Sequence, residues 1–155
     1  MNAIPVKDVY PAPRVDVSID KMNGALYFAK MDLRSGFYQI RVATEDIHKT
    51  AFETECGSFQ WLVMPFGLTN LPRTFQSAMD MTFQDMRDFT AVCMDGIVVF
   101  SNTWAAHLAS LDLVLQRLRE AKFYAKHSKC EFASEEIDLS AFVFPGGGYE
   151  LNLAK

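Results

Sequence analysis

The sequence lacks several features that would assign it to a familiar class. Its three cysteines are odd in number and widely spaced. We therefore expect neither a disulfide framework nor a Cys-x-x-Cys metal site, and a reducing compartment fits best. No run approaches the roughly 18 apolar residues needed to cross a bilayer, and residues 1–15 have no apolar signal core. These absences predict an intracellular protein, cytoplasmic or nuclear, that is not secreted and has no membrane partner.

An excess of positive charge is also lacking. Fifteen Lys and Arg against nineteen Asp and Glu give a net charge of −4. Nucleic-acid binders usually carry a basic surface, because phosphate contacts dominate their affinity, so this balance argues mildly against that function. The exception is the stretch 117–129, with five cationic residues and one acidic residue. Charge alone favours a solvated helix face and its exit loop there, and leaves a phosphate-binding track as the alternative.

Apolar residues make up 50% of the 155 residues, enough for one sizeable core. Residues 25–32 form an apolar run that ends in a carboxylate, and residues 37–42 alternate between two faces, so both are predicted strands. Residues flanking Cys56-Gly57-Ser58 and Asp95-Gly96 predict two hairpins. Residues 137–144 predict a further strand, followed by a turn at Pro145-Gly-Gly-Gly148.

Two helices are predicted from apolar residues at spacings of three and four. Residues 15–22 fit either a helix or a strand, and Gly24, a good helix terminator, favours the helix. His107 is expected at the helix surface or boundary, and no histidine has metal-ligand spacing. The predicted order is helix, strands, helix, hairpin, helix and strand. This order favours an α+β fold with an antiparallel sheet and helices on one face. The predicted apolar helix faces are Leu71, Phe75, Met79, Phe83 and Met86, and Trp104, Leu108, Leu111, Leu115 and Leu118.

Only two predicted strands end in an isolated acid, at Asp32 and Asp95. An aspartate at such a position can bind a hard cation such as Mg²⁺. Two adjacent strands of this kind could bring both carboxylates to one site for phosphoryl transfer. By spacing alone, ordinary turn chemistry is the commoner explanation of an Asp next to a Gly.

Several short motifs lie around and beyond these acids. They are Tyr10-Pro-Ala-Pro-Arg14, Met31-Asp-Leu-Arg-Ser-Gly-Phe-Tyr-Gln-Ile40, Lys49-Thr-Ala-Phe52, Met64-Pro-Phe-Gly-Leu-Thr-Asn70, Pro72-Arg-Thr-Phe-Gln76, Leu115-Gln-Arg-Leu-Arg-Glu-Ala-Lys122 and Ser128-Lys-Cys-Glu-Phe132. Together they resemble the reverse transcriptase of gypsy-type LTR retrotransposons. Similar motifs occur in the same order from about residue 2 to about residue 143, which leaves an unrelated α+β domain as a remote alternative. The resemblance implies a palm with a ferredoxin-like core and part of the fingers.

The same resemblance implies how the domain is divided. Residues 1–10 would be a remnant of the fingers, 11–39 and 71–148 the two parts of the palm, and 40–70 a fingers insertion. The thumb, connection and RNase H regions are expected to be absent from this chain. An intact element would supply them, together with an integrase, as further segments of a polyprotein.

The resemblance also implies the site residues. Asp32 and Asp95 match catalytic carboxylates that hold two Mg²⁺ ions, and Phe37 matches the ring that excludes a 2′-hydroxyl. The implied partners are an RNA or DNA template-primer and deoxynucleoside triphosphates. The residues implied to bind nucleotide are Leu33, Arg34, Ser35, Gly36, Phe37, Phe66 and Gly67. Those implied to contact template or primer are Met94, Leu139, Ser140 and Ala141.

One position departs from the family pattern in a way that matters for chemistry. Where the family pattern has a third carboxylate, this sequence has Gly96. Losing one metal ligand would cost roughly 3–5 kcal/mol of transition-state binding, or about a 10²–10⁴-fold slowing. We therefore predict weak or absent RNA-directed DNA synthesis. The alternative is a non-enzymatic remnant, or a domain retained for binding nucleic acid or protein.

Overall fold

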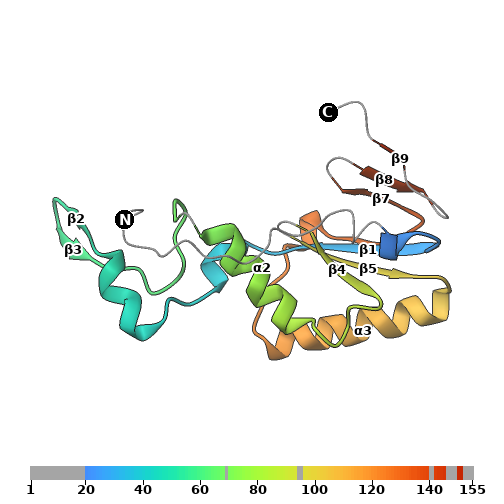
Figure 1. The fold of residues 1–155 in the computed structure, drawn as a ribbon, viewed down its shortest axis with the longest axis horizontal. Helices are drawn as coiled ribbons and strands as arrows, with labels where there is room; N and C mark the ends of the chain where they lie inside the picture. Colours follow the sequence, from blue (N-terminus) through green and yellow to red (C-terminus); the bar gives the residue numbers. More distant parts are fainter. Residues whose placement is uncertain (1–19, 69, 94–95, 140–141, 146–149, 152–155) are drawn as a thin grey trace.

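A four-stranded antiparallel sheet forms the centre of the molecule (Figure 1). The computed structural model describes residues 20–68, 70–93, 96–139, 142–145 and 150–151. Strand β1 pairs with β5 on one side and with β6 on the other, and β5 also pairs with β4. The strands are β4 (Thr90–Cys93), β5 (Gly96–Ser101), β1 (Tyr27–Asp32) and β6 (Glu131–Ser134), in that spatial order.

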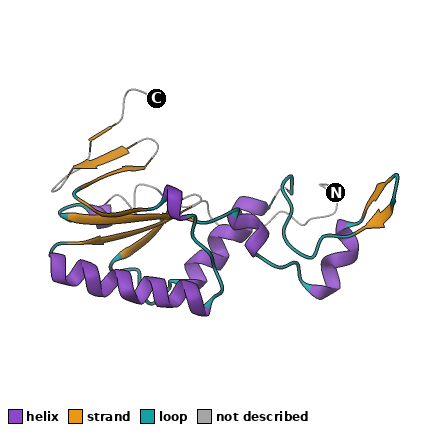
Figure 2. Ribbon diagram, turned by 180° about the vertical axis from the view of Figure 1, so that it is seen from behind, coloured by secondary structure: helices purple, strands orange, loops and turns teal. Residues whose placement is uncertain are grey.

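Helices α2 (Leu71–Thr82) and α3 (Trp104–Glu120) cover one face of this sheet (Figure 2). Successive residues of a strand point to opposite faces, so Ile97 and Val99 pack toward the helices while Val98 and Phe100 pack the other way. Both faces are buried, which accounts for the nearly continuous apolar run of β5. The predicted α+β fold, with an antiparallel sheet and helices on one face, is confirmed.

The opposite face is covered by shorter pieces of chain. Residues 20–22 are helical and Gly24 follows at φ 86°, so the described end of the 15–22 segment fits the helical interpretation. Met22, Phe28 and Ile137 meet there in a second apolar cluster. Ile137 belongs to a three-stranded sheet of β7 (Glu136–Leu139), β8 (Phe142–Pro145) and β9 (Glu150–Leu151).

The segment between β1 and α2 extends away from the central sheet (Figure 1). It contains η1 (Gly36–Gln39), η2 (Thr44–Thr50), and a small hairpin of β2 (Phe52–Thr54) and β3 (Gly57–Phe59). The predicted hairpin is present, but Thr54 pairs with Gly57, so its turn is Glu55-Cys56 and not Cys56-Gly57-Ser58.

The predicted strand over residues 37–42 is wrong. Residues Gly36–Gln39 form a 3₁₀ turn, in which the amides of Tyr38 and Ile40 bond to the carbonyls of Ser35 and Phe37. A strand requires a partner along its edge, and only Arg41 finds one, in a single bridge to Val63. Within this turn, the rings of Phe37 and Tyr38 both contact Phe66, and each has one further partner, Phe75 and Trp61 respectively.

Two other predicted strand boundaries shift. Residues 137–144 form not one strand but the β7–β8 hairpin, with Leu139 paired to Phe142. In the β4–β5 hairpin Cys93 pairs with Gly96, so Gly96 is the first residue of a strand and not part of the turn. Gly96 also lies opposite Asp32 of β1, so it is paired on both sides and belongs to the strand.

The predicted helices are present, but only part of the predicted face of α3 is buried. Leu71, Phe75, Met79, Phe83 and Met86 are all buried, although α2 ends at Thr82. On α3, by contrast, Trp104, Leu108 and Leu115 are exposed, while Leu111 is partly buried. Leu118 is buried as predicted, and the buried face continues through His107 and Val114, which were not in the predicted set. The buried residues of α3 are His107, Val114 and Leu118.

His107 is therefore a core residue, and its predicted surface position is wrong. Its ring is fully buried and lies 6.3 Å from that of Tyr27 and 6.4 Å from that of Trp104. Burial lowers the pKa of its imidazole, because the charged form would lose its hydration. Among the described helices none has the length and apolarity to span a membrane.

Candidate active site

Asp32 ends the central strand β1 and lies directly opposite Gly96, the first residue of β5. Its side chain is 23% exposed, so the carboxylate is partly desolvated but still accessible. Asp95 precedes Gly96 in the sequence and lies outside the described residues. The strand pairing thus brings the start of β5 beside Asp32, as the sequence-based hypothesis requires.

An open pocket of about 630 Å³ begins at Asp32. It contains six of the seven residues predicted to bind nucleotide; Gly67, exposed and at φ 94°, does not line it. Two segments line most of this pocket: the β1 wall (residues 32–37) and the η3 wall (residues 125–129), named after η3 (His127–Lys129). The predicted residues in the lining are Leu33, Arg34, Ser35, Gly36, Phe37 and Phe66.

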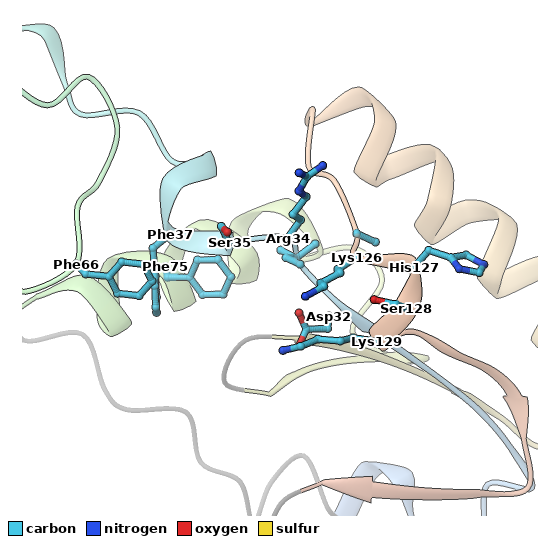
Figure 3. Close-up of a pocket in the computed structure, with 13 residues that line it drawn as sticks. Asp32, Arg34, Ser35, Phe37, Phe66, Phe75, Lys126, His127, Ser128 and Lys129 are labelled. Carbon is cyan, nitrogen blue, oxygen red and sulfur yellow. The ribbon is translucent and has the colours of Figure 1, made fainter.

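One end of the pocket is aromatic (Figure 3). The ring of Phe37 lies 5.3 Å from that of Phe66 and 5.2 Å from that of Phe75, both edge-to-face. A Cβ on Gly36 would come within 2.9 Å of the Phe75 ring, so glycine lets the chain approach α2 closely. Ser35 adopts a left-handed conformation at φ 50° just before this contact.

The other end is basic. The Lys129 ammonium lies 3.2 Å from Oδ2 of Asp32, and Figure 3 shows Lys126 directed to the same carboxylate. Sequence reasoning did not assign these lysines to the site. The signal was the cationic stretch 117–129, whose last third forms the η3 wall although its charge pattern alone favoured a solvated surface.

Backbone hydrogen bonds join the two walls. The Lys126 amide donates to the Asp32 carbonyl at 2.8 Å, and the Arg34 amide donates to the Tyr124 carbonyl at 2.9 Å. Leu33 and Ala125 form an antiparallel bridge between them. The η3 wall is therefore held in place as a short continuation of the sheet, which is how residues so far apart in sequence come to share one pocket.

Gly96 lies very close to β1. A Cβ built on it would come within 2.9 Å of the Met31 carbonyl oxygen and 3.9 Å of the Asp32 Cα. Side-chain carbons do not approach a backbone oxygen that closely, so any other residue requires the strands to shift. The glycine is thus accommodated by close strand contact, and not by a left-handed turn as its Asp-Gly context suggested.

The described residues around Asp32 offer few ligands to a divalent ion. The Asp32 carboxylate suits one ligand position, at a strand end with an oxygen facing the pocket. Within the described part of the chain, no three acidic, histidine or cysteine side chains gather into a metal-binding group. Asp32 already has an ammonium partner in Lys129. Any ion here would therefore depend on Asp95 for a second carboxylate and would lack a third.

The residues predicted to contact template or primer are only partly placed. Met94, Ser140 and Ala141 lie outside the described residues. Leu139 is the last residue of β7, where it pairs with Phe142 of β8. Their roles stay predictions.

Comparison with known proteins gives a consistent result. The family model described as "Reverse transcriptase (RNA-dependent DNA polymerase)" matches residues 1–143. The chain is 36% identical to the retrovirus-related Pol polyprotein from transposon 297 of Drosophila melanogaster, over 100% of this chain and 15% of the polyprotein. It is 31% identical to the transposon Tf2-3 polyprotein of Schizosaccharomyces pombe, over 96% of this chain and 11% of the polyprotein. The chain thus spans only a small part of these relatives.

Solved structures of foamy viral protease-reverse transcriptase share the fold. One in complex with double-stranded DNA superposes with a TM-score of 0.87 at 21% identity, covering 98% of this chain and 27% of the viral chain. Another, in complex with an RNA/DNA hybrid, has a TM-score of 0.75 at 23% identity, covering 88% of this chain and 19% of the viral chain.

Proposed function

This chain belongs to the reverse transcriptase family, and we propose that it is a palm-and-fingers domain of a retrotransposon polymerase with impaired nucleotidyl transfer. By descent its reaction is RNA-directed DNA synthesis. One observation carries the proposal: the pocket at Asp32 gathers six of the seven residues predicted to bind nucleotide. Leu33, Arg34 and Ser35 directly follow β1, and Gly36 and Phe37 begin η1. Phe66, from the loop before α2, joins this continuous segment from a distant part of the chain.

The two ends of the pocket suit the two ends of a deoxynucleoside triphosphate. The rings of Phe37, Phe66 and Phe75 offer an apolar surface to the sugar and base. The cationic side chains of Arg34, Lys126 and Lys129 would attract the phosphates. Asp32 lies at the basic end, where a triphosphate would place its reacting phosphorus.

Mg²⁺ would be held by Asp32 and Asp95, with two ions expected from the family resemblance. When bound, such ions supply charge that stabilises both the attacking and the leaving oxygens. The missing carboxylate at Gly96 and the ammonium of Lys129 both weaken cation binding here. We therefore propose low ion occupancy as the cause of impaired activity.

Nucleic acid is the proposed macromolecular partner. The foamy viral neighbours were solved with double-stranded DNA and with an RNA/DNA hybrid, and we extend that class of ligand to this chain. The division into palm (11–39 and 71–148) and fingers (1–10 and 40–70) belongs to the same proposal. So do an intracellular location, gypsy-type ancestry, and joint action with the thumb and RNase H segments of a polyprotein.

Primer extension with Mg²⁺ and with Mn²⁺ tests the proposal. The informative pair is Gly96→Asp and Gly96→Asn, because both add the same crowding against Met31 while only the first adds charge. We expect Gly96→Asp to extend primers roughly 10²–10⁴-fold faster than Gly96→Asn. If the parent chain already matches Gly96→Asp, Gly96 does not limit catalysis. The further substitution Asp32→Asn should abolish any activity of the Gly96→Asp variant.

A second candidate function is binding without catalysis. It is favoured by the Asp32–Lys129 ion pair, which gives the carboxylate a cation that is not a metal. This alternative predicts that the parent binds an RNA/DNA duplex, whereas neither Gly96→Asp nor added Mn²⁺ produces extension. Fluorescence anisotropy of a labelled duplex would detect such binding.

A further inference from the structure

Gln39 belongs to the motif around Asp32 but has no part in the proposed chemistry. Its side chain makes three hydrogen bonds, one to Arg34, which lines the pocket, and two to Tyr124. The amide nitrogen donates to the Tyr124 carbonyl at 3.0 Å and to the Arg34 carbonyl at 2.6 Å. Its amide oxygen accepts from the Tyr124 backbone N–H at 2.7 Å.

This pattern needs a terminal group that donates and accepts at once. The Gln39 amide satisfies both backbone groups of Tyr124, as a paired residue on an adjacent strand would. Tyr124 is 85 residues away in the sequence, so the contact joins two distant segments. A glutamate would lose the donors, and an isosteric methionine would lose all three bonds.

The joined segments are those that carry the two walls of the pocket. The backbone ladder between residues 32–34 and 124–126 ends at the Arg34–Tyr124 bond. Gln39 extends that ladder by one step, from η1 back across Tyr124. Beyond Tyr124 the chain leads directly to Lys126 and Lys129, so its placement sets where those ammonium groups stand relative to Asp32.

We infer that Gln39 is a positioning residue that fixes the η3 wall against the β1 wall, and thereby the spacing between Asp32 and the lysines that would hold a nucleotide's phosphates. This inference rests on the proposed nucleotide-binding function for its ligand. Its geometric part stands on the hydrogen bonds alone. The two parts can therefore fail separately.

The test compares the full 155-residue chain with Gln39→Met, Gln39→Glu and a matched control, Gln84→Met. Gln84 is an exposed glutamine away from the pocket. Hydrogen exchange at the Tyr124 amide reports directly on the hydrogen bonds between Gln39 and Tyr124. Binding of a fluorescent N-methylanthraniloyl dATP reports on the affinity of the pocket for a nucleotide. Thermal melting of every variant identifies any that fail to fold.

In Gln39→Met we expect protection of the Tyr124 amide to fall about 5- to 50-fold, since partly exposed neutral hydrogen bonds each contribute modestly. The dATP dissociation constant should rise about 3- to 10-fold. Gln39→Glu keeps the acceptor for the Tyr124 N–H, so protection should change less while affinity still falls. Gln84→Met should match the parent in both measurements.

Each outcome is decisive. Unchanged protection of the Tyr124 amide in Gln39→Met shows that Gln39 does not hold Tyr124 in place. Lost protection with unchanged affinity for the dATP probe overturns the positioning role. If the parent chain does not bind the dATP probe, the proposed nucleotide binding is overturned. Hydrogen exchange then still shows whether Gln39 holds Tyr124 in place. If Gln39→Met does not fold, Gln39→Glu decides instead. Largely retained protection of the Tyr124 amide together with weaker binding of the dATP probe supports the proposal, and unchanged binding of the probe overturns it.

Discussion

The central sheet and the outlying segment use aromatic residues in different ways. In the sheet and its helices, Phe28 and Phe83 are almost wholly enclosed and stabilise the fold by removing apolar surface from water. In the segment 36–66, the rings remain partly exposed and contact one another in series. Burial therefore accounts for the first region, and ring-to-ring contact for much of the second.

The series of rings leads from the hairpin to α2. Consecutive centroids lie 5.9, 5.7, 6.0, 5.1, 5.3 and 5.2 Å apart. Its last members line the pocket, so the position of the hairpin is linked to the shape of the aromatic end. The rings in order are Phe59, Phe52, Trp61, Tyr38, Phe66, Phe37 and Phe75.

The largest expected effect comes from removing a ring from the sheet. Phe28→Ala should lower the free energy of unfolding by about 3–5 kcal/mol, because the side chain is fully buried and leaves a cavity. Phe59→Ala, which truncates a 47% exposed ring, should cost under about 1 kcal/mol. Urea denaturation measures both. Equal losses would erase the contrast between the regions.

A smaller loss of stability is expected from substituting Gly96, where β5 lies very close to β1. Gly96→Ala should lower the free energy of unfolding by about 1–3 kcal/mol, because its Cβ would crowd the Met31 carbonyl and push β5 from β1. Ser58→Ala, at an exposed position of β3, is the control and should be nearly neutral. A neutral Gly96→Ala would show that the strands have room for a side chain.

Breaking the series of rings should act locally. Tyr38→Ala removes contacts to Trp61 and Phe66 and should cost about 1–2 kcal/mol. Hydrogen exchange should accelerate in β2 and β3 while the amides of β1 and β5 keep their protection. Phe132→Ala, an exposed ring on β6, is the control. Uniform acceleration across both regions would show that they unfold as one unit.

The smallest expected effect is a pH dependence from the core. Burial depresses the pKa of His107, so the unfolded chain binds its proton more readily than the folded chain does. The free energy of unfolding should therefore fall as pH drops below the ordinary histidine value of about 6.5, by at most about 1.4 kcal/mol per pH unit for one proton. Chemical denaturation at several pH values should show this slope reduced in His107→Phe and retained in His48→Gln. If His107→Phe leaves the slope unchanged, the pH dependence of the free energy of unfolding comes from other groups.

Local patterns predicted the elements well and their environments less well. Strand β1, the β4–β5 hairpin and helices α2 and α3 follow from periodicity, since a strand or a helix imposes its own spacing on apolar residues. The predicted strand over residues 37–42 was wrong because alternation does not reveal whether a partner edge exists. The predicted face of α3 was only partly right, because two overlapping sets of residues on this helix fit the same spacing and only packing selects between them.

Two features of this protein are determined by the sequence alone. The ordered motifs indicate its family, and position 96 holds a glycine, which has no side-chain carboxylate. Tertiary structure decided the rest of the site: it joined Gln39 to Tyr124, 85 residues away, and set Lys129 against Asp32, 97 residues away. Contacts at such separations depend on how the whole chain packs, because the residues near each partner in sequence carry no information about the other.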